Sequence, residues 1–108
     1  MTHPRKLLDG AIHSPARFSV MATLNAVEKV EFGFVRDTVE LSDSALSQHL
    51  TKLADAGYVE VSKVQEGRRT RTWLSATPAG RAAFEQHVAL LNLIAGGHGD
   101  EPGAATEP

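Results

Sequence analysis

The chain has 108 residues, 42% hydrophobic and 22% charged, with a formal net charge of −2 at pH 7. Without internal repeats, a chain of this length forms one small domain with a modest core. It contains no cysteine, which excludes disulfides, thiolate metal sites and cysteine nucleophiles. No segment approaches the ~18 apolar residues of a membrane span, and the start does not resemble a signal peptide, so we expect a cytoplasmic protein.

The negative charge is concentrated at the C-terminus. Residues 96–108 contain three acidic residues and no lysine or arginine, whereas residues 1–95 contain eleven basic and ten acidic residues. The same terminal stretch is rich in Gly and Pro, which predicts a disordered acidic tail. We therefore divide the chain into one folded domain, residues 1–95, and a tail, residues 96–108. The net charge does not exclude a nucleic-acid partner, because the distribution of charge matters more than its sum.

The first part of the chain is expected to be helical. Residues 5–13 carry apolar side chains at helical spacing and predict a short helix. Ser14 followed by Pro15 is typical of an N-cap and a first helical residue, and the helix predicted there ends near Val30. After a short extended or turn segment, a brief helix is expected at 34–40. The expected core face of the longer helix consists of Phe18, Met21, Leu24 and Val27, with Val20 at its edge.

The stretch 42–58 predicts an amphipathic helix that follows a tight turn. Ser42 has the chemistry of an N-cap, and Gly57 is the expected stop. Its leucines form one narrow apolar stripe at positions 46, 50 and 53. The opposite face carries short polar side chains, an amide and one lysine, which suit close approach to the floor of the DNA major groove. An ordinary solvent-exposed helix is the alternative.

Two strand-like runs, 58–65 and 70–76, flank a hairpin tip at 66–69. From Lys63 to Arg71 there are four basic residues and one acidic residue, the most basic part of the chain. Basic side chains at a hairpin tip are suited to phosphates or to a narrow minor groove. A solvated turn is the alternative, but the position directly after a helix-turn-helix favours DNA.

Thr77 and Pro78 repeat the cap-and-proline signal and predict a helix over 78–95. Its apolar arc is broader than one small domain covers from one side, and a second chain is the simplest cover. The sequence therefore predicts a homodimer. The expected interface residues are Leu7, Leu8, Ile12, Phe84, His87, Val88, Leu90, Leu91 and Ile94, with Leu90, Leu91 and Ile94 near the centre.

Three segments, Ile12–Leu24, Leu41–Val61 and Gly67–Phe84, resemble the small one-domain winged-helix regulators of bacteria related to the MarR and ArsR families. The S-x-H-L block, the Gly-Arg wing and the T-P-x-G-R motif carry the resemblance, which covers about residues 7–92. It implies a mainly α fold with a small β-hairpin (α+β): a winged helix-turn-helix with a two- or three-stranded wing sheet and a C-terminal dimerisation helix.

The resemblance also implies a function. Such proteins are transcription regulators or repressors that bind specific sequences in double-stranded DNA, usually as homodimers on inverted-repeat operators. Their third helix enters the major groove, and the wing contacts the backbone or the minor groove. The residues assigned to DNA are Ser44, Ala45, Ser47, Gln48, His49, Thr51, Lys52, Lys63, Arg68, Arg69 and Arg71.

Other functions find less support. The ArsR-type cysteine metal site is missing, and we expect no metal, no cofactor and no membrane partner. A small-molecule effector is compatible with the sequence but is not indicated by it. There is no phosphate-cradling loop, nucleophile motif or recognisable carboxylate pair, so we expect no enzyme. The remaining alternative is a winged helix used as a protein-interaction module. Such a module does not need arginines at the hairpin tip.

His49 and His87 occupy different positions on their predicted helices. His49, on the flank of its helix, could bond a phosphate, stabilise the turn before Ser42 or bind water. His87 lies within an apolar arc and is interpreted as a core histidine with one ring nitrogen hydrogen-bonded, because no second ligand lies at i+3 or i+4. His3, His13 and His98 are too scattered to form a site. Trp73 is expected on the outer face of the sheet or across the dimer.

Overall fold

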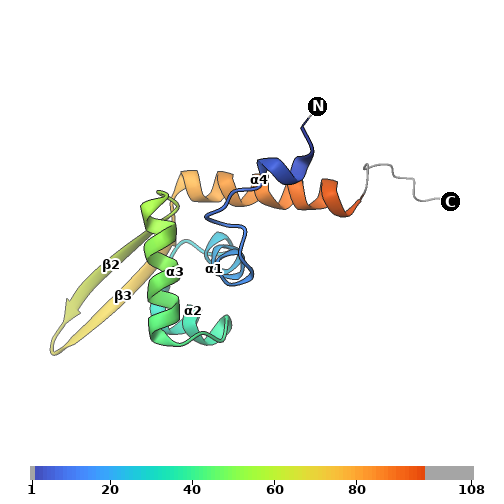
Figure 1. Cartoon of the computed structure of the whole chain (residues 1–108). Helices are drawn as coiled ribbons and strands as arrows, with labels where there is room; N and C mark the ends of the chain where they lie inside the picture. Colours follow the sequence, from blue (N-terminus) through green and yellow to red (C-terminus); the bar gives the residue numbers. More distant parts are fainter. Residues whose placement is uncertain (1, 97–108) are drawn as a thin grey trace.

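The computed structural model describes residues 2–96, so the predicted tail lies outside the described residues apart from Gly96. The elements in chain order are the 3-10 turn η1 (Pro4–Leu7), α1 (Pro15–Asn25), β1 (Val30–Glu31), α2 (Phe32–Thr38), α3 (Asp43–Asp55), β2 (Val59–Glu66), β3 (Arg69–Ala76) and α4 (Pro78–Ala95). The strands form one antiparallel sheet in the order β1-β3-β2. Helix α3 lies beside α1, which is seen nearly end-on, and the β2–β3 hairpin projects away from the helices (Figure 1). The predicted α+β winged-helix architecture is confirmed.

The core lies where α1, α2 and α3 meet the inner face of the sheet. The predicted leucine stripe of α3 is confirmed, since Leu46, Leu50 and Leu53 are all buried. Val20, expected at the edge of the core, has no exposed surface, whereas Val27, expected inside, is 38% exposed. The other fully buried apolar side chains are Ile12, Met21, Leu24, Val35 and Leu74.

The predicted helix at 5–13 is wrong. Only η1 is helical, and the chain then turns at Asp9, whose carboxylate accepts a hydrogen bond from the amide of Ala11 (2.9 Å). The carbonyl of Asp9 accepts bonds from the amides three and four residues further on (3.0 and 2.7 Å). These local bonds replace a helical ladder. They bring Ile12 into the core with no exposed surface, so Ile12 is a core residue and not the interface residue that the sequence predicted.

Helix α1 ends at Asn25, earlier than predicted, and this early end places Val27 outside the core. The guanidinium of Arg81 donates hydrogen bonds to the carbonyls of Asn25 (3.0 Å) and Val27 (2.8 Å), so these acceptors are satisfied without further helical turns. The chain then leaves the helix and continues to β1, which pairs with β3. Helix α2 begins at Phe32, two residues before the predicted start.

Hydrogen bonds form a joint between the start of α4 and the residues that directly follow α3. Thr77 caps α4 by accepting a bond from the amide of Gly80 (3.0 Å), and its hydroxyl donates to the carbonyl of Gly57 (2.6 Å). Its amide donates to the carbonyl of Tyr58 (3.0 Å). A Cβ atom at Gly80 would lie 2.1 Å from that carbonyl oxygen, so only glycine lets the helix approach this closely. The T-P-x-G-R motif therefore builds this joint.

Candidate DNA-binding surface

Helix α3 presents a polar face, and the helix has a defined cap at its start and a defined stop at its end. The hydroxyl of Ser42 accepts a bond from the amide of Ala45 (3.1 Å), and Gly57, with a φ of +82°, ends the helix. Because the leucine stripe faces inward, the opposite side of α3 is solvent-exposed. Of the predicted contacts, Ser44, Ser47, Gln48, Thr51 and Lys52 are exposed, and Ala45 and His49 are partly buried.

The β2–β3 hairpin carries the second set of predicted contacts. The strands stay in register from the Val59–Ala76 pair to the Glu66–Arg69 pair, so the turn at the tip is Gly67-Arg68, with a φ of +61° at the glycine. The prediction placed Arg69 in the turn, but it lies in β3. Lys63, Arg68 and Arg69 are all exposed.

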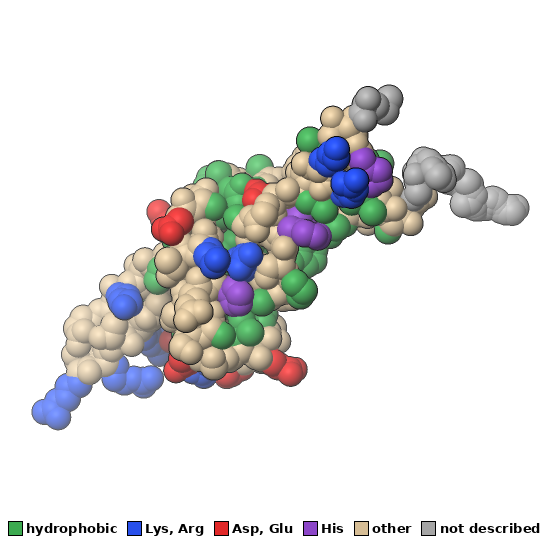
Figure 2. All heavy atoms as spheres, in the orientation of Figure 1, with side chains coloured by type: hydrophobic (Ala, Val, Ile, Leu, Met, Phe, Trp, Pro, Cys, Tyr) green, Lys and Arg blue, Asp and Glu red, His purple; other side chains and the backbone are tan. Residues whose placement is uncertain are grey.

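The positive charges of these elements share one face of the molecule. Figure 2 shows lysine and arginine side chains over the projecting hairpin, over the middle of the molecule where α3 lies, and over the N-terminal segment. Such an extended arrangement suits a polyanion, whose charge is also distributed along its length. The formal net charge of −2 conceals it.

Arg71 differs from the other basic residues of the hairpin. Its Nε atom lies 3.2 Å from a carboxylate oxygen of Glu66 and 3.7 Å from one of Glu31. Its guanidinium also lies 6.0 Å from the ring centroid of Trp73, where the ammonium of Lys29 is 5.0 Å away. Since the neighbouring Leu74 is fully buried, Trp73 occupies the outer face of the sheet. Arg71 therefore has ion-pair partners within its own chain, and its predicted DNA contact stays a prediction.

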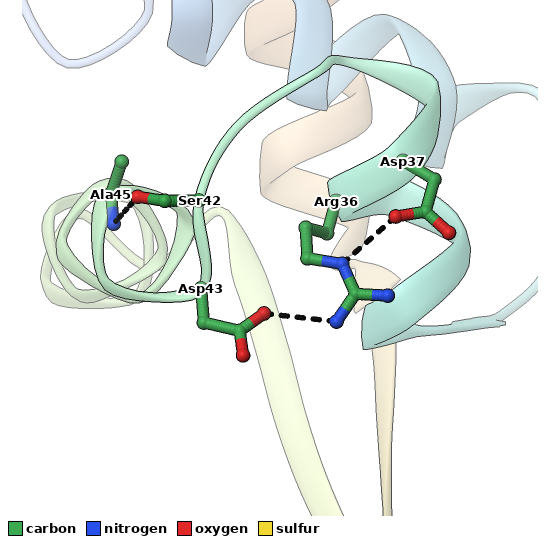
Figure 3. Close-up of polar contacts among 5 residues, drawn as sticks. All are labelled: Arg36, Asp37, Ser42, Asp43 and Ala45. Carbon is green, nitrogen blue, oxygen red and sulfur yellow. Dashed lines mark hydrogen bonds and ion pairs between the residues drawn. The ribbon is translucent and has the colours of Figure 1, made fainter.

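The turn that introduces α3 is held by ion pairs that the sequence analysis missed (Figure 3). The guanidinium of Arg36 bonds the carboxylates of Asp37 and Asp43, each at 2.9 Å, and so connects α2 to the first turn of α3. These carboxylates raise the pKa of Arg36, and the guanidinium lowers the pKa of Asp37. Glu40 adopts a φ of +56° in this turn, and the amide of Leu41 bonds the carbonyl of Arg36 (3.0 Å).

Arg17 is a further residue that the sequence analysis missed. It lies in α1, and its Nη1 atom is 3.2 Å from Nδ1 of His49 on α3. This contact, and not the turn before Ser42, holds the imidazole of His49. Burial is the main cause that lowers the pKa of His49, and the charges of Arg17 and Lys52 lower it further. No local sequence pattern connects positions that are 32 residues apart.

The predicted interface residues divide into two groups. Leu7 is 58% exposed, and Leu8, Phe84, Val88, Leu91 and Ile94 are partly exposed along η1 and α4, which pack together (Figure 1). His87 and Leu90 are covered by their own chain, with 1% and 5% exposure. The sequence predicted Leu90 near the centre of the interface, and this prediction is wrong because its own chain buries Leu90. Leu93, which the sequence analysis omitted, is 49% exposed.

His87 has a partner that its sequence neighbours do not reveal. Its Nε2 atom lies 3.4 Å from Nδ1 of His13, a contact between residues far apart in the chain that the sequence analysis did not predict. The prediction that one ring nitrogen of His87 is hydrogen-bonded is confirmed, while its Nδ1 is buried without a partner among the described residues. Burial lowers the pKa of His87, and His13 adds to the effect. No third residue of the described chain completes a metal site around this pair.

A helix-turn-helix with an exposed polar second helix, followed by a basic hairpin, defines a winged-helix DNA-binding domain. Residues 16–94 match the family described as winged helix DNA-binding domain, and the chain belongs to this family. It is also 33% identical, over 76 residues, to the uncharacterized protein MJ0432 of Methanocaldococcus jannaschii, and the match covers 70% of this chain and 83% of that protein.

Solved structures share the fold. The transcriptional regulator homologue from Pyrococcus horikoshii OT3 superposes with a TM-score of 0.82 at 22% identity, over 89% of this chain and 97% of that one. The zinc-responsive MarR family member ZitR from Lactococcus lactis gives a TM-score of 0.57 at 18% identity, over 76% and 56% of the two chains. The predicted winged-helix resemblance is confirmed by the family match, and the fold is shared with a MarR family member. In residues 2–96, no helix has the length and apolar character needed to cross a membrane.

Proposed function

We propose that this protein is a sequence-specific transcription regulator, a repressor, that binds an inverted-repeat operator in double-stranded DNA as a homodimer in the cytoplasm. The observation that carries the proposal is the combination of an exposed polar face on α3 with hairpin cations that are not neutralised. Lys63, Arg68 and Arg69 form no ion pair with any described residue. Charges without an internal partner are suited to phosphate oxygens.

The recognition helix supplies the sequence preference. Ser44, Ala45, Ser47 and Thr51 are small enough to let the backbone of α3 approach the floor of the major groove. Gln48, exposed at the middle of this face, is suited to paired hydrogen bonds with an adenine. Lys52 provides a charge for the adjacent phosphates, and His49 borders the same face.

The homodimer follows from the size of the contact. One α3 spans only a few base pairs, which is too little sequence to specify a site in a genome, whereas a two-fold dimer reads two half-sites. The exposed apolar side chains of η1 and α4 provide the surface for pairing, with Leu91 and Ile94 as its central residues. Leu7, Leu8, Phe84, Val88 and Leu93 contribute around them. Occupation of an operator by such a dimer excludes other proteins from it, which is the simplest route to repression.

A protein-interaction module is the second candidate. The observation in its favour is a groove of about 550 Å³ between α3 and the hairpin, whose lining includes the apolar side chains of Phe32, Leu50 and Val61. Asp43 and Asp55 also line this groove and would repel a phosphate. The groove could accept an extended segment of another protein, but this function leaves the charges of Arg68 and Arg69 without a role.

Selection of bound sequences from random DNA, followed by a salt titration on the selected site, tests the proposal. Log affinity should fall with log salt by about 0.9 for each phosphate neutralised. The double variant Arg68→Ala and Arg69→Ala should weaken binding to every sequence and flatten this slope by about 0.9 for each phosphate that is no longer neutralised. The control is Lys29→Ala, because Lys29 stacks on Trp73 at the outer face of the sheet. An unchanged slope in the double variant would contradict the wing contact, and recovery of no sequence would contradict DNA binding.

A further inference from the structure

Arg17 connects three parts of the chain near the recognition helix. Its Nε atom donates to the carbonyl of Ala11 (2.7 Å), and Nη2 donates to the carbonyl of Gly10 (3.4 Å). Its Nη1 atom faces Nδ1 of His49 at 3.2 Å. The two carbonyls belong to the turn that precedes α1, so the guanidinium is held from behind while it contacts the side chain on α3.

The chemistry of the two groups fixes the proton on His49. A guanidinium carries only N–H donors and keeps its charge at every physiological pH. A hydrogen bond from Nη1 therefore requires Nδ1 of His49 to be the acceptor. A ring that accepts at Nδ1 is neutral and carries its hydrogen on Nε2. A doubly protonated ring would instead place a donor against a donor.

The surroundings of His49 favour the same state. Burial lowers the pKa of the ring, and two positive charges, Arg17 on α1 and Lys52 on α3, act in the same direction. An imidazole with a lowered pKa stays neutral at neutral pH. The charge of this part of the surface thus comes from Arg17 and Lys52, while His49 contributes a hydrogen-bond donor.

The position of His49 determines what this donor meets. Helical spacing places it next to Ala45 and Lys52, at the edge of the polar face that lies next to α1. When a helix occupies the major groove, its centre faces the bases and its edges face the sugar-phosphate walls. We propose that Arg17 positions His49 as a neutral imidazole whose Nε2–H donates a hydrogen bond to a DNA phosphate. This inference rests on the proposed DNA-binding function.

The proton position is tested on the protein alone. Long-range ¹H–¹⁵N correlation spectra of the ¹⁵N-labelled full chain, with His49 assigned by its absence in His49→Gln, should show a neutral ring protonated on Nε2 at pH 7. Arg17→Lys retains a charged donor and should retain this form, whereas Arg17→Met should give a mixture of tautomers. A ring protonated on Nδ1 or on both nitrogens in the unmutated protein would overturn the inference. Because no DNA is present, this result does not depend on the proposed function.

The contact is tested on DNA. His49→Ala should weaken binding to the selected operator and to unrelated DNA by the same factor, on the order of tenfold, since one hydrogen bond to a charged group is removed. His49→Gln places an amide N–H near the position of Nε2 and should restore most of the affinity. The slope of log affinity against log salt should stay unchanged in His49→Ala, because a neutral donor releases no counterion, whereas Lys52→Gln should flatten it by about 0.9.

The other results of the DNA measurements overturn either the inference about His49 or the proposed function. A flatter slope in His49→Ala would show a charged imidazole, and a loss confined to the operator would show a base contact; both overturn the inference. Unchanged affinity in His49→Ala would also overturn it. Failure of the unmutated protein to bind any DNA would instead overturn the proposed function, whatever the spectra show. Thermal unfolding of Arg17→Met, compared with Arg17→Lys, separates disruption of the preceding turn from removal of the hydrogen bond to His49.

Discussion

Helices α3 and α4 differ in how completely their own chain covers them. Helix α3 buries all three of its stripe leucines and exposes only polar or small side chains on its outer face. Helix α4 is fixed at its first turn by Gly80, but towards its end it buries only His87 and Leu90, and Leu93 remains 49% exposed. The difference teaches that the two exposed surfaces have different requirements. A polar face is stable in water and can await DNA, whereas an apolar face gains from a permanent cover.

The largest expected effect comes from breaking the proposed cover of α4. Leu91→Glu would place an unpaired carboxylate in the interface, which costs about 3–5 kcal/mol and should lower operator affinity at least about a hundredfold. Sedimentation should show monomers. Gln86→Glu adds the same charge at an exposed position of α4 and is the control. If the unmutated protein sediments as a monomer at micromolar concentration, the homodimer proposal is wrong.

The next effect concerns the joint between the two helices. Gly80→Ala forces a Cβ atom against the carbonyl of Tyr58, so α4 must shift, and we expect a loss of about 3 kcal/mol in the free energy of unfolding. Gly33→Ala is the matched control, because its Cβ would meet only the guanidinium of Arg36, at 3.4 Å. The control should be neutral or up to about 1 kcal/mol more stable. Urea denaturation measures both, and equal stabilities would contradict the joint.

A smaller effect is expected on the polar face of α3. Gln48→Ala should relax the preference for one base in each half-site by about 1–3 kcal/mol while leaving non-specific binding nearly unchanged. A selection experiment repeated with the variant measures this directly. Uniform weakening on all sequences would instead make Gln48 a backbone contact. Comparison with His49→Ala then distinguishes a base contact at the centre of the helix from a phosphate contact at its edge.

The smallest effect is a pH dependence of stability that compares the histidines of the two helices. Because burial lowers the pKa of His87 in the folded chain, the unfolded chain binds a proton first, at about pH 6.5. The free energy of unfolding should therefore decrease as the pH falls through this value, because the unfolded chain takes up a proton that the buried His87 does not. His49 acts in the same direction. His87→Leu should flatten the free energy of unfolding between pH 7 and pH 5.5 more than His3→Gln does; equal profiles would contradict this origin.

Local patterns predicted the elements whose ends and faces are encoded nearby in the sequence. The caps Ser42 and Thr77, the stop at Gly57 and the leucine stripe gave α3 and the start of α4, and the basic turn gave the hairpin tip. In the candidate site, the exposed polar face and the exposed cations Arg68 and Arg69 followed from the same patterns.

The features that sequence reasoning missed depend on residues far apart in the chain. Arg81 ends α1 from 56 residues away, and His13 meets His87 across 74 residues. Neither contact leaves a periodic signal. The burial of Ile12 was missed for a related reason, because hydrogen bonds to Asp9 replace the helix that its apolar spacing suggested. Arg17 and Arg36 were overlooked because a single arginine in a helix has no pattern that reveals its partner.

The packing of the first residues against α4 has a consequence for how the chain is completed during synthesis. His13 contacts His87, Phe18 lies 5.2 Å from Phe84 between ring centroids, and η1 packs on α4. The helix-turn-helix and the hairpin are built from contacts close in sequence and can form as they leave the ribosome. The N-terminal segment precedes α4 in the chain, so η1 and Phe18 must wait for the last helix before they can pack against it. Ribosome-bound chains that stop before residue 78 should therefore expose this segment to chaperones and proteases.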